Sequence, residues 1–559
     1  MFFLTYVAAV AGCDSSADSD DDVRVPAFAA VTPLTALDAQ LIVQRAVASI
    51  DDPNLHVAVV DRRGALLGVF SSLGPPALDE DNIAVSLART TAFFSNSQAP
   101  LSSRTVQFLS TFHFPATFGN GFVPSVCPQS GVGLCPNTAI APQQITSGVK
   151  GTARGPLWQI NATNRGAEVA TLATVPPTLF NAGQAFPRSL NINGTFPSPG
   201  ITLLPGAVPL YKNGRLVGGV GCFTRPGPAG DPDILAAEFA AISGASGSGL
   251  PGDEDFFLRI DPKGAIFLGG ILLPYVNQTT RPANRLPGLF PPPPPDPRWL
   301  VFVDELGGLS ILRNGTIDPF GYLIGPRASV TPVAPVGLTQ AEVDLIITQC
   351  IQTSDKTRAA IRLPLGTSAK IIAVITDVRG LILAHFRMED TLTDAVDVVP
   401  AKARSAVYYS LPGGPAILDQ WPGFPIDPLN GVAVTTTALG FLSQTFYPPG
   451  IDGQPAGPLF ALALQNQLPA QASLQGNAPP DPGYQNGLIF FPGAVPLYKN
   501  GVLVGGLGVS GDGVENNDFI ARGGARGFDA PSQLRIDRFK FRGVRIPFLK
   551  FPQNPGGGS

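Results

Sequence analysis

The sequence has few charged residues, few histidines and few sulfur-containing residues. Of its 559 residues 14% are charged, three are His, five are Cys and two are Met, and the formal net charge is -4. This near-neutral balance excludes the strongly basic footprint of a nucleic-acid-binding protein. Three histidines and no Cys-x-x-Cys-His motif exclude a multi-histidine zinc enzyme and covalently attached c-type heme.

Glycine, proline and apolar residues are abundant instead. The 63 Gly and 58 Pro make up about a fifth of the chain, which is below the roughly 25–30% typical of disordered sequences. Apolar residues account for 44% and can form a substantial core. The length favours two or more domains.

The N-terminus resembles a bacterial lipoprotein signal. A short apolar run at residues 1–12 cannot span a bilayer as a helix, and small residues lead up to Cys13. The resemblance implies a signal at 1–13, lipidation of Cys13, an acidic tether at 14–33 and an exported lipoprotein anchored in the periplasm or on the cell surface. No Lys or Arg precedes the apolar run, so either the basic region of such a signal is missing or the true start lies upstream. A soluble protein with an apolar first strand is the alternative.

The cysteines outside the N-terminus fall into two classes. Cys127 and Cys135 lie in a loop rich in Gly, Pro and Ser, which predicts a local disulfide. Cys222 and Cys350 lie in apolar segments, and we expect both to be buried and inert.

Two long segments repeat each other. The stretch Pro205–Gly221 recurs almost unchanged at Pro492–Gly508, and further matches flank it, so we predict a tandem duplication. The first half is residues 34–280, and the second half is residues 338–553. Between Phe108 and Gly155 the first half is 31 residues longer than the second half is at the equivalent place. The predicted disulfide lies in this insertion, which favours a structural role for it.

Proline-rich segments separate and interrupt the halves. Residues 281–337 form a predicted linker, with a stiff polyproline stretch at 291–295 and short strands at 299–303 and 309–312. The excursions at 96–204 and 411–491 are long and weakly charged, so we expect them to pack on the halves or on a neighbouring chain. Residues 554–559 are a tail.

Within each half the patterns predict helix, hairpin, helix, hairpin and helix. Thr339 and Glu342 form a capping box before an amphipathic stripe in the second half. The first hairpin turns at Asp61–Gly64, and the second turns at Asn213-Gly214, a strong hairpin signal. The intervening helix covers 83–94 in the first half and 399–409 in the second. The fold class is therefore α+β with antiparallel sheets.

This order and its motifs resemble the GlcG/HbpS-like heme-binding domain family. Its hallmarks are D-x-x-G in the first hairpin, then R-M-D, then K-A-x-x-A, and a closing glycine-rich hairpin with a downstream Asp. The second half carries the matching motifs Asp377–Gly380, Arg387-Met388-Glu389, Lys402-Ala403, Gly505–Gly511 and Asp518. The first half keeps its D-x-x-G and Asp231, but Ser71 stands where R-M-D begins and Leu87 replaces the lysine.

The resemblance implies two tandem profilin-like domains, each a sheet with helices on both faces, frequent oligomers and, in some members, binding or degradation of heme. The second half is the better candidate for a site. His385 or Met388 is the expected axial ligand. Carboxylates or other anions are expected to bind the remaining candidate residues, which are Arg387, Lys402, Arg404, Ser510 and Gly511. A packed histidine and ordinary ion pairs are the alternative interpretation. None of the three histidines, His56, His113 and His385, is matched by a histidine in the other half, so the duplication favours no one of them.

Other motifs carry less. The G-x-G-x-x-G beginning at Gly506 lies in a hairpin, so close packing explains it better than a dinucleotide. Asp512, Glu515 and Asp518 offer oxygen ligands without EF-hand spacing, and we expect no metal there. The first functional hypothesis is thus an exported heme-binding lipoprotein. The alternatives are a structural or assembly protein of the cell envelope, as a homo-oligomer or with an envelope partner, and an enzyme acting on a small organic acid.

Overall fold

The computed structural model describes most of both halves, and residues 31–559 fall within one compact unit. Cys13, Cys127, Cys135, His113 and the strand expected at 309–312 lie outside the described residues. The described residues are 31–75, 79–111, 114, 154–158, 160, 201–227, 230–246, 266–301, 321–329, 336–412, 431–451, 453–460 and 489–551.

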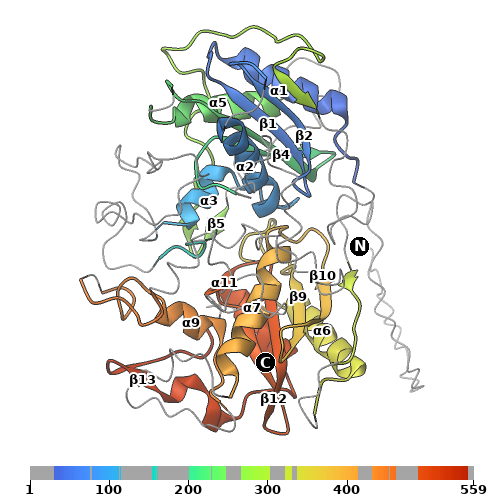
Figure 1. The fold of residues 1–559 in the computed structure, drawn as a ribbon, viewed down its shortest axis with the longest axis vertical. Coiled ribbons are helices and arrows are strands. Elements are labelled where there is room, and N and C mark those ends of the chain that lie inside the picture. The colour runs from blue at the N-terminus through green and yellow to red at the C-terminus, as the bar shows by residue number, and fades with distance from the viewer. Residues whose placement is uncertain are drawn as a thin grey trace, which may run out of the picture. The chain divides into compact units, whose positions relative to one another are not determined.

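The described elements follow the predicted order of helix, hairpin, helix, hairpin and helix in each half (Figure 1). Those up to residue 301 are α1 (Ala36–Ser49), β1 (His56–Asp61), β2 (Leu66–Ser71), α2 (Asp79–Phe94), α3 (Ser103–Leu109), β3 (Ala207–Lys212), β4 (Arg215–Phe223), α5 (Ile234–Ala245), β5 (Phe267–Leu268), β6 (Ile271–Leu272) and β7 (Trp299–Val301). Those that follow are β8 (Gly321–Ile324), α6 (Gln340–Asp355), β9 (Ile372–Asp377), β10 (Ile382–Arg387), α7 (Ala395–Ser410), α9 (Thr436–Leu442), β11 (Ala494–Lys499), β12 (Val502–Ser510), α11 (Val514–Gly524), η10 (Ser532–Leu534), η11 (Ile536–Arg538), β13 (Lys540–Phe541) and β14 (Val544–Arg545).

Two five-stranded antiparallel sheets form the centre of the halves. Their strand orders are β3-β4-β1-β2-β7 and β11-β12-β9-β10-β8, so each position in one sheet has a counterpart in the other. The predicted linker supplies an edge strand to each sheet, because β7 pairs with β2 and β8 pairs with β10. The α+β class with antiparallel sheets is confirmed.

Helices cover both faces of each sheet (Figure 1). In the first half α1 and α5 pack on one face through Ile42, Val43 and Ala240, and α2 packs on the other. Glycines let the second helix come close: a Cβ on Gly221 would lie 2.3 Å from the Ala84 carbonyl oxygen, and one on Gly508 would lie 2.6 Å from that of Val399. This supports the packing interpretation of the glycine motif in β12.

The predicted turns have the expected geometry. In the first hairpin, the Asp61 carboxylate accepts from the backbone N–H groups of Arg63 and Ala65, and Gly64 has φ +80°. In the second hairpin, Asn213 and Gly214 both have positive φ, as a type I′ turn requires. Local side-chain chemistry thus fixes both hairpins.

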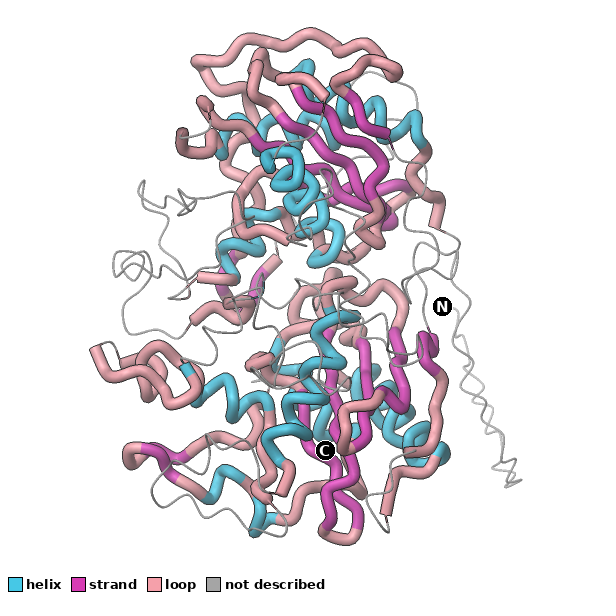
Figure 2. The backbone as a smooth tube through the Cα atoms, in the orientation of Figure 1, coloured by secondary structure: helices cyan, strands magenta, loops and turns pink. Residues whose placement is uncertain are grey.

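Two helices that we did not predict from the sequence lie in the excursions. Ser102 caps α3 through a reciprocal bond with Thr105, and Thr435 caps α9. The Ser102 and Thr435 hydroxyls also donate to the Tyr275 and Phe548 carbonyl oxygens. Loops still make up much of the described chain (Figure 2).

The two halves share one apolar core and one buried ionic cluster. A single cluster of buried side chains contains Val85 and Phe93 of the first half and Val374 and Val396 of the second. In the ionic cluster the Asp390 carboxylate accepts from four donors, which are Arg62 Nη1 at 2.8 Å, Arg362 Nη1 at 3.1 Å, Ser97 N at 2.9 Å and Ser97 Oγ at 2.8 Å. Arg62 and Ser97 belong to the first half, so Asp390 joins the halves.

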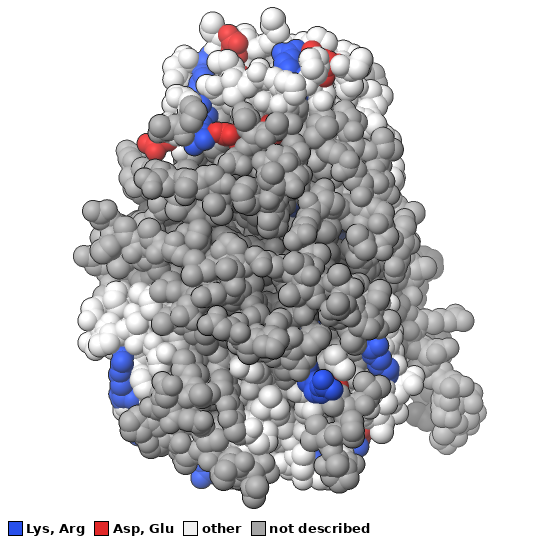
Figure 3. Space-filling view, in the orientation of Figure 1, with Lys and Arg blue, Asp and Glu red and all other residues white. Residues whose placement is uncertain are grey.

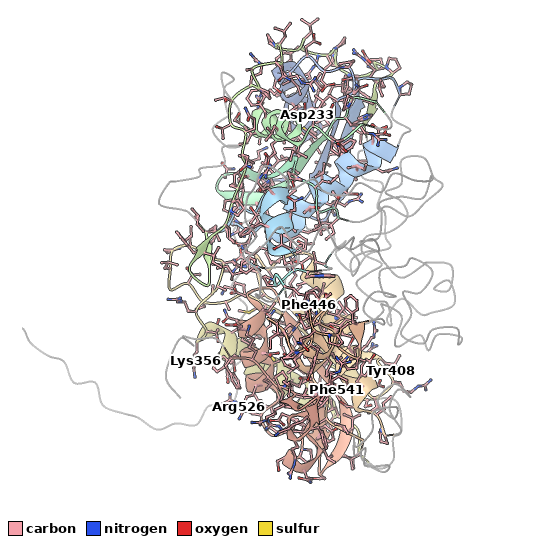
Figure 4. All side chains as sticks on the ribbon, turned by 90° about the vertical axis from the view of Figure 1, so that its left-hand side faces the viewer. Asp233, Lys356, Tyr408, Phe446, Arg526 and Phe541 are labelled. Carbon is pink, nitrogen blue, oxygen red and sulfur yellow. The ribbon has the colours of Figure 1, made fainter. Side chains whose placement is uncertain are left out.

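The surface of the described part shows few charged side chains in one view. On the face seen in Figure 3 its Lys, Arg, Asp and Glu side chains are few and scattered. Charged side chains also act locally, as where Asp233 caps α5 (Figure 4) by accepting from the Ala236 N–H. None of the helices in the described residues is long and apolar enough to cross a membrane.

Candidate functional site

His385 lies in β10 with no exposed surface. Its cross-strand partner is Val374, a residue of the shared core, so the imidazole points toward that core. Within the described part of the chain, neither ring nitrogen has a hydrogen-bond partner. Burial, together with the charges of Arg387 and Arg404, lowers the pKa of His385 to about 3. The imidazole is therefore neutral at neutral pH and keeps a lone pair, as an iron ligand must.

Two buried guanidinium groups belong to the same neighbourhood. Arg404 in α7 donates from Nε to the Gly380 carbonyl oxygen at 2.8 Å, and Arg387 donates from Nη2 to the Thr391 carbonyl oxygen at 2.9 Å. Both side chains are at most 1% exposed. The alternative interpretation, ordinary ion pairs at the surface, therefore does not fit these two buried side chains, which place positive charge beside His385.

Met388 belongs to the other face of the sheet. It packs in the cluster that contains Phe386 and Ile371, whereas His385 is paired with a residue of the shared core. Alternation along a strand separates the two faces. The structure thus does not bring Met388 to the position of His385, and the two are not interchangeable ligands of one group.

Lys402, Ser510 and Gly511 form a second cluster at the end of β12. Lys402 Nζ donates to the Pro492 carbonyl oxygen at 2.8 Å, and to the Val509 carbonyl oxygen and Ser510 Oγ at 3.1 Å each. Gly511 follows with φ +124°. Burial lowers the pKa of Lys402 to about 7, against the charges of Asp518 and Asp394. The three donor positions of the ammonium are occupied, so it does not point at an open anion site.

The charges of two buried carboxyl groups, Asp518 and Asp394, raise the pKa of this lysine. Asp518 accepts from the Gly493 and Lys550 N–H groups at 2.7 Å each and from the Thr437 hydroxyl, and burial raises its pKa to about 6. Burial raises the pKa of Asp394 to about 7, and among the described residues its Oδ1 has no hydrogen-bond partner. Asp394 was missed in the sequence because no motif marks it; only the fold brings it near Lys402.

The structure changes which first-half residue is equivalent to Asp518. It also shows that Asp512, Glu515 and Asp518 have different partners. Asp518 is the fifth residue of α11 and Glu238 the fifth of α5, so Glu238, not Asp231, is the counterpart of Asp518. Asp512 accepts from the Ala360 N–H at 2.8 Å, and Glu515 pairs with Lys550. No group of three or more metal-ligating His, Cys, Asp or Glu side chains occurs within the described ranges.

The side chains around His385 have the chemistry that heme binding requires, but their burial restricts the access of heme. A neutral imidazole without hydrogen bonds and two flanking guanidinium groups suit an iron and its porphyrin carboxylates. The imidazole and both guanidinium groups are fully or almost fully buried, so a heme reaches this histidine only if its cover moves. The residues of the adjoining edge strand β8 are half-buried or exposed.

Comparisons with known proteins found similarity to solved structures only. No family model matches the chain, and no curated protein matches it. The crystal structure of a PduOC–heme complex is 20% identical, and the match covers 35% of this chain and 99% of that one, with a TM-score of 0.22. Klebsiella pneumoniae protein ORFY of DUF336 is 19% identical, and the match covers 36% of this chain and 99% of that one, with a TM-score of 0.22. HbpS is 15% identical, and the match covers 36% of this chain and 96% of that one, with a TM-score of 0.21.

Proposed function

We propose that the second half binds heme, with His385 as the iron ligand. The observation that carries the proposal is the fully buried imidazole whose two ring nitrogens have no partner among the described residues. A buried polar group without a hydrogen bond costs about 1–3 kcal/mol, and such groups concentrate at functional sites. Bound heme would supply an iron for this nitrogen, and Arg387 and Arg404 would hold its carboxylates.

The edge strand β8 is the cover that we propose moves to admit heme. It pairs with β10 directly beside the histidine, at His385 and Ile324, and its Tyr322 is 38% exposed. Displacing an edge strand leaves the rest of the sheet paired. Heme uptake should therefore be slow compared with uptake by an open pocket.

Titration of the purified full-length chain with hemin tests the proposal. We expect a shifted Soret band that saturates at one heme per chain and is absent in His385→Leu. Met388→Leu is the matched control and should keep the band, because Met388 packs on the other face of the sheet. No spectral change at micromolar hemin, or an unchanged band in His385→Leu, would contradict the proposal.

A second candidate function is structural: a fused pair of domains that assembles with other chains. The matching strand orders and the shared core support our proposal that the halves arose by duplication. Leu286, Leu289 and Phe290 are 70%, 87% and 60% exposed and offer apolar contact surface. Sedimentation should then show a concentration-dependent oligomer that Leu289→Ser weakens; a strict monomer would count against this function.

We further propose that the chain is exported and anchored by a lipid on Cys13. The support is the apolar run and the small residues before this cysteine. Expression in a bacterial host should yield a membrane-associated protein whose N-terminal peptide carries a diacylglyceryl mass. Cys13→Ser should release the protein from the membrane; equal membrane association of the two forms would contradict anchoring.

A further inference from the structure

The second half has a pocket that shares no residue with the His385 site. It has a volume of about 390 Å³ and lies where α9, the end of α11, η11 and residues 545–551 meet. Phe441 of α9 forms one wall, and Phe548 and Phe551 line the pocket from the C-terminal segment. This size suits a small molecule of a few rings.

Arginine dominates the charge of this pocket. Arg522, Arg535 and Arg545 line it together with a single carboxylate, Asp537. Asp537 accepts from Arg535 Nη2 and from Arg545 Nη2, both at 2.9 Å, so one negative charge is shared by two cations. Arg522 has no ion pair within the described part of the chain. Because guanidinium groups stay protonated, the pocket keeps two positive charges in excess.

The guanidinium groups lie against aromatic rings. The Arg535 Cζ is 4.3 Å from the centroid of the Phe548 ring, and the Arg522 Cζ is 5.9 Å from that of Phe551. The N–H edge of Arg535 is already bound to Asp537 through Nε and Nη2, so Arg522 is the stacked guanidinium group whose N–H edge can bind an oxyanion. Phenylalanine faces and cation edges together match a flat ring that carries an acidic group.

The first half has the same local backbone without this charge. Its hairpin β5–β6 corresponds to β13–β14, and both are followed by a proline, Pro274 or Pro547. Leu272 stands at the position of Arg545. In the helix before the hairpin, Ile242 of α5 stands at the position of Arg522 of α11. Since the fold forms with apolar residues here, the arginines are not needed for folding, which points to a ligand.

We propose that this pocket binds an aromatic oxyanion, a planar ring system with a carboxylate or sulfonate group. The rings of Phe441 and Phe548 contact the aromatic part, and Arg522 and Arg545 hold the anionic group. The site does not depend on heme binding, because it uses neither His385 nor its neighbours.

Fluorescence titration of the full-length chain tests the site with 8-anilinonaphthalene-1-sulfonate. N-phenyl-1-naphthylamine, which has the same rings without the sulfonate, is the uncharged comparison probe. The variants Arg522→Ile and Arg545→Leu install the first-half residues. Arg526→Ile is the control, because Arg526 is exposed (Figure 4) and lies just past α11, outside the pocket lining.

We expect saturable binding of one sulfonate probe per chain, weakened about tenfold in Arg522→Ile and in Arg545→Leu, the loss expected for one charge-assisted contact. Arg526→Ile should stay within about twofold of the unmodified chain. The uncharged probe should bind more weakly and respond to none of the variants. Equal binding of the two probes, or an equal loss in Arg526→Ile, would overturn the proposal. Melting curves confirm that each variant is folded.

Discussion

The two halves have the same strand order, but buried polar side chains at equivalent positions have different partners in the two halves. In the first half, Arg104 and Glu238 form a two-bonded ion pair at 2.6 and 2.8 Å, and both are at most 5% exposed. In the second half, Thr437 of α9 and Asp518 of α11 take the equivalent positions, and the Thr437 hydroxyl donates to the Asp518 carboxylate. The nearby cation is Lys402, which donates to the Pro492 carbonyl oxygen and not to Asp518. At these equivalent positions the first half therefore pairs its two buried charges directly, whereas in the second half the Asp518 carboxylate accepts from a neutral hydroxyl.

The two described histidines, one in each half, also differ in whether their ring nitrogens have a hydrogen-bond partner. His56 of the first half lies 2.7 Å from the Asp81 carboxylate through Nδ1, and both side chains are buried. His385 has neither ring nitrogen paired among the described residues, and Asp394 has an unpaired Oδ1 there. Unpaired buried groups reduce stability and are retained where they serve a function. This difference between the two histidines agrees with our proposal that the second half binds a ligand.

The largest effect should come from breaking the first-half ion pair. Arg104→Ala should lower the free energy of unfolding by about 3–5 kcal/mol, because it leaves the Glu238 carboxylate buried without its cation. Thr437→Ala, at the counterpart position, should cost only about 1–2 kcal/mol, since one neutral donor is lost. Urea denaturation measures both. Equal losses would show that the halves do not differ in this respect.

Asp390 provides the next test, because it joins the halves. Although burial alone would raise its pKa, Arg62 and Arg362 hold the pKa of Asp390 at about 2. Asp390→Asn tolerates the positive φ of 56° but removes the charge, so we expect a loss of about 2–3 kcal/mol in the free energy of unfolding at pH 7.

The pH dependence of this loss has a definite sign. The folded pKa of Asp390 is below the unfolded value near 3.8. Its contribution is therefore complete above about pH 4 and disappears as the pH falls toward 2. Denaturation curves at pH 7 and at pH 2.5 should show the two proteins converging; a constant difference would mean that Asp390 does not act through its charge.

Local patterns in the sequence predicted the element order, the hairpin turns and the burial of Cys222 and Cys350. They did so because capping and turn chemistry act over a few residues. Helices α3 and α9 were missed among proline-rich neighbours, although the Ser102–Thr105 spacing was readable as a cap.

The candidate site was predicted less completely. The burial of Arg387, Arg404 and Lys402 and the opposite faces of His385 and Met388 depend on strand register. The contact of Asp390 with Arg62 joins residues 328 apart. Edge strand β8 comes from the predicted linker. Contacts of this range are set by packing of the whole chain, and no local pattern records them.

The substitution of Asp by Asn should increase the free energy of unfolding at Asp394, whereas it decreases the free energy of unfolding at Asp390. Burial raises its pKa to about 7, against the charge of Lys402. Because the folded pKa lies above the unfolded one, the stability that this group contributes is complete below about pH 4 and lost as the pH rises through 7. Asp394→Asn should therefore gain about 1 kcal/mol at pH 8 and nothing at pH 4. A loss at pH 8 like that of Asp390→Asn would indicate a partner for its Oδ1.

The smallest effect is expected at His385, and its size sharpens the contrast between the halves. His385→Leu should change the free energy of unfolding at pH 7 by between zero and a gain of about 1 kcal/mol, because two unpaired nitrogens leave the core. His56→Leu breaks the bond to Asp81 and should cost about 2 kcal/mol. The pKa of His385 is about 3 when folded, below the unfolded value of 6.5. The unmodified chain therefore loses stability as the pH falls from 6.5 toward 3, and the advantage of His385→Leu should grow at pH 4.5. Urea denaturation without heme at both pH values measures this; a cost equal to that of His56→Leu would mean that the imidazole is paired.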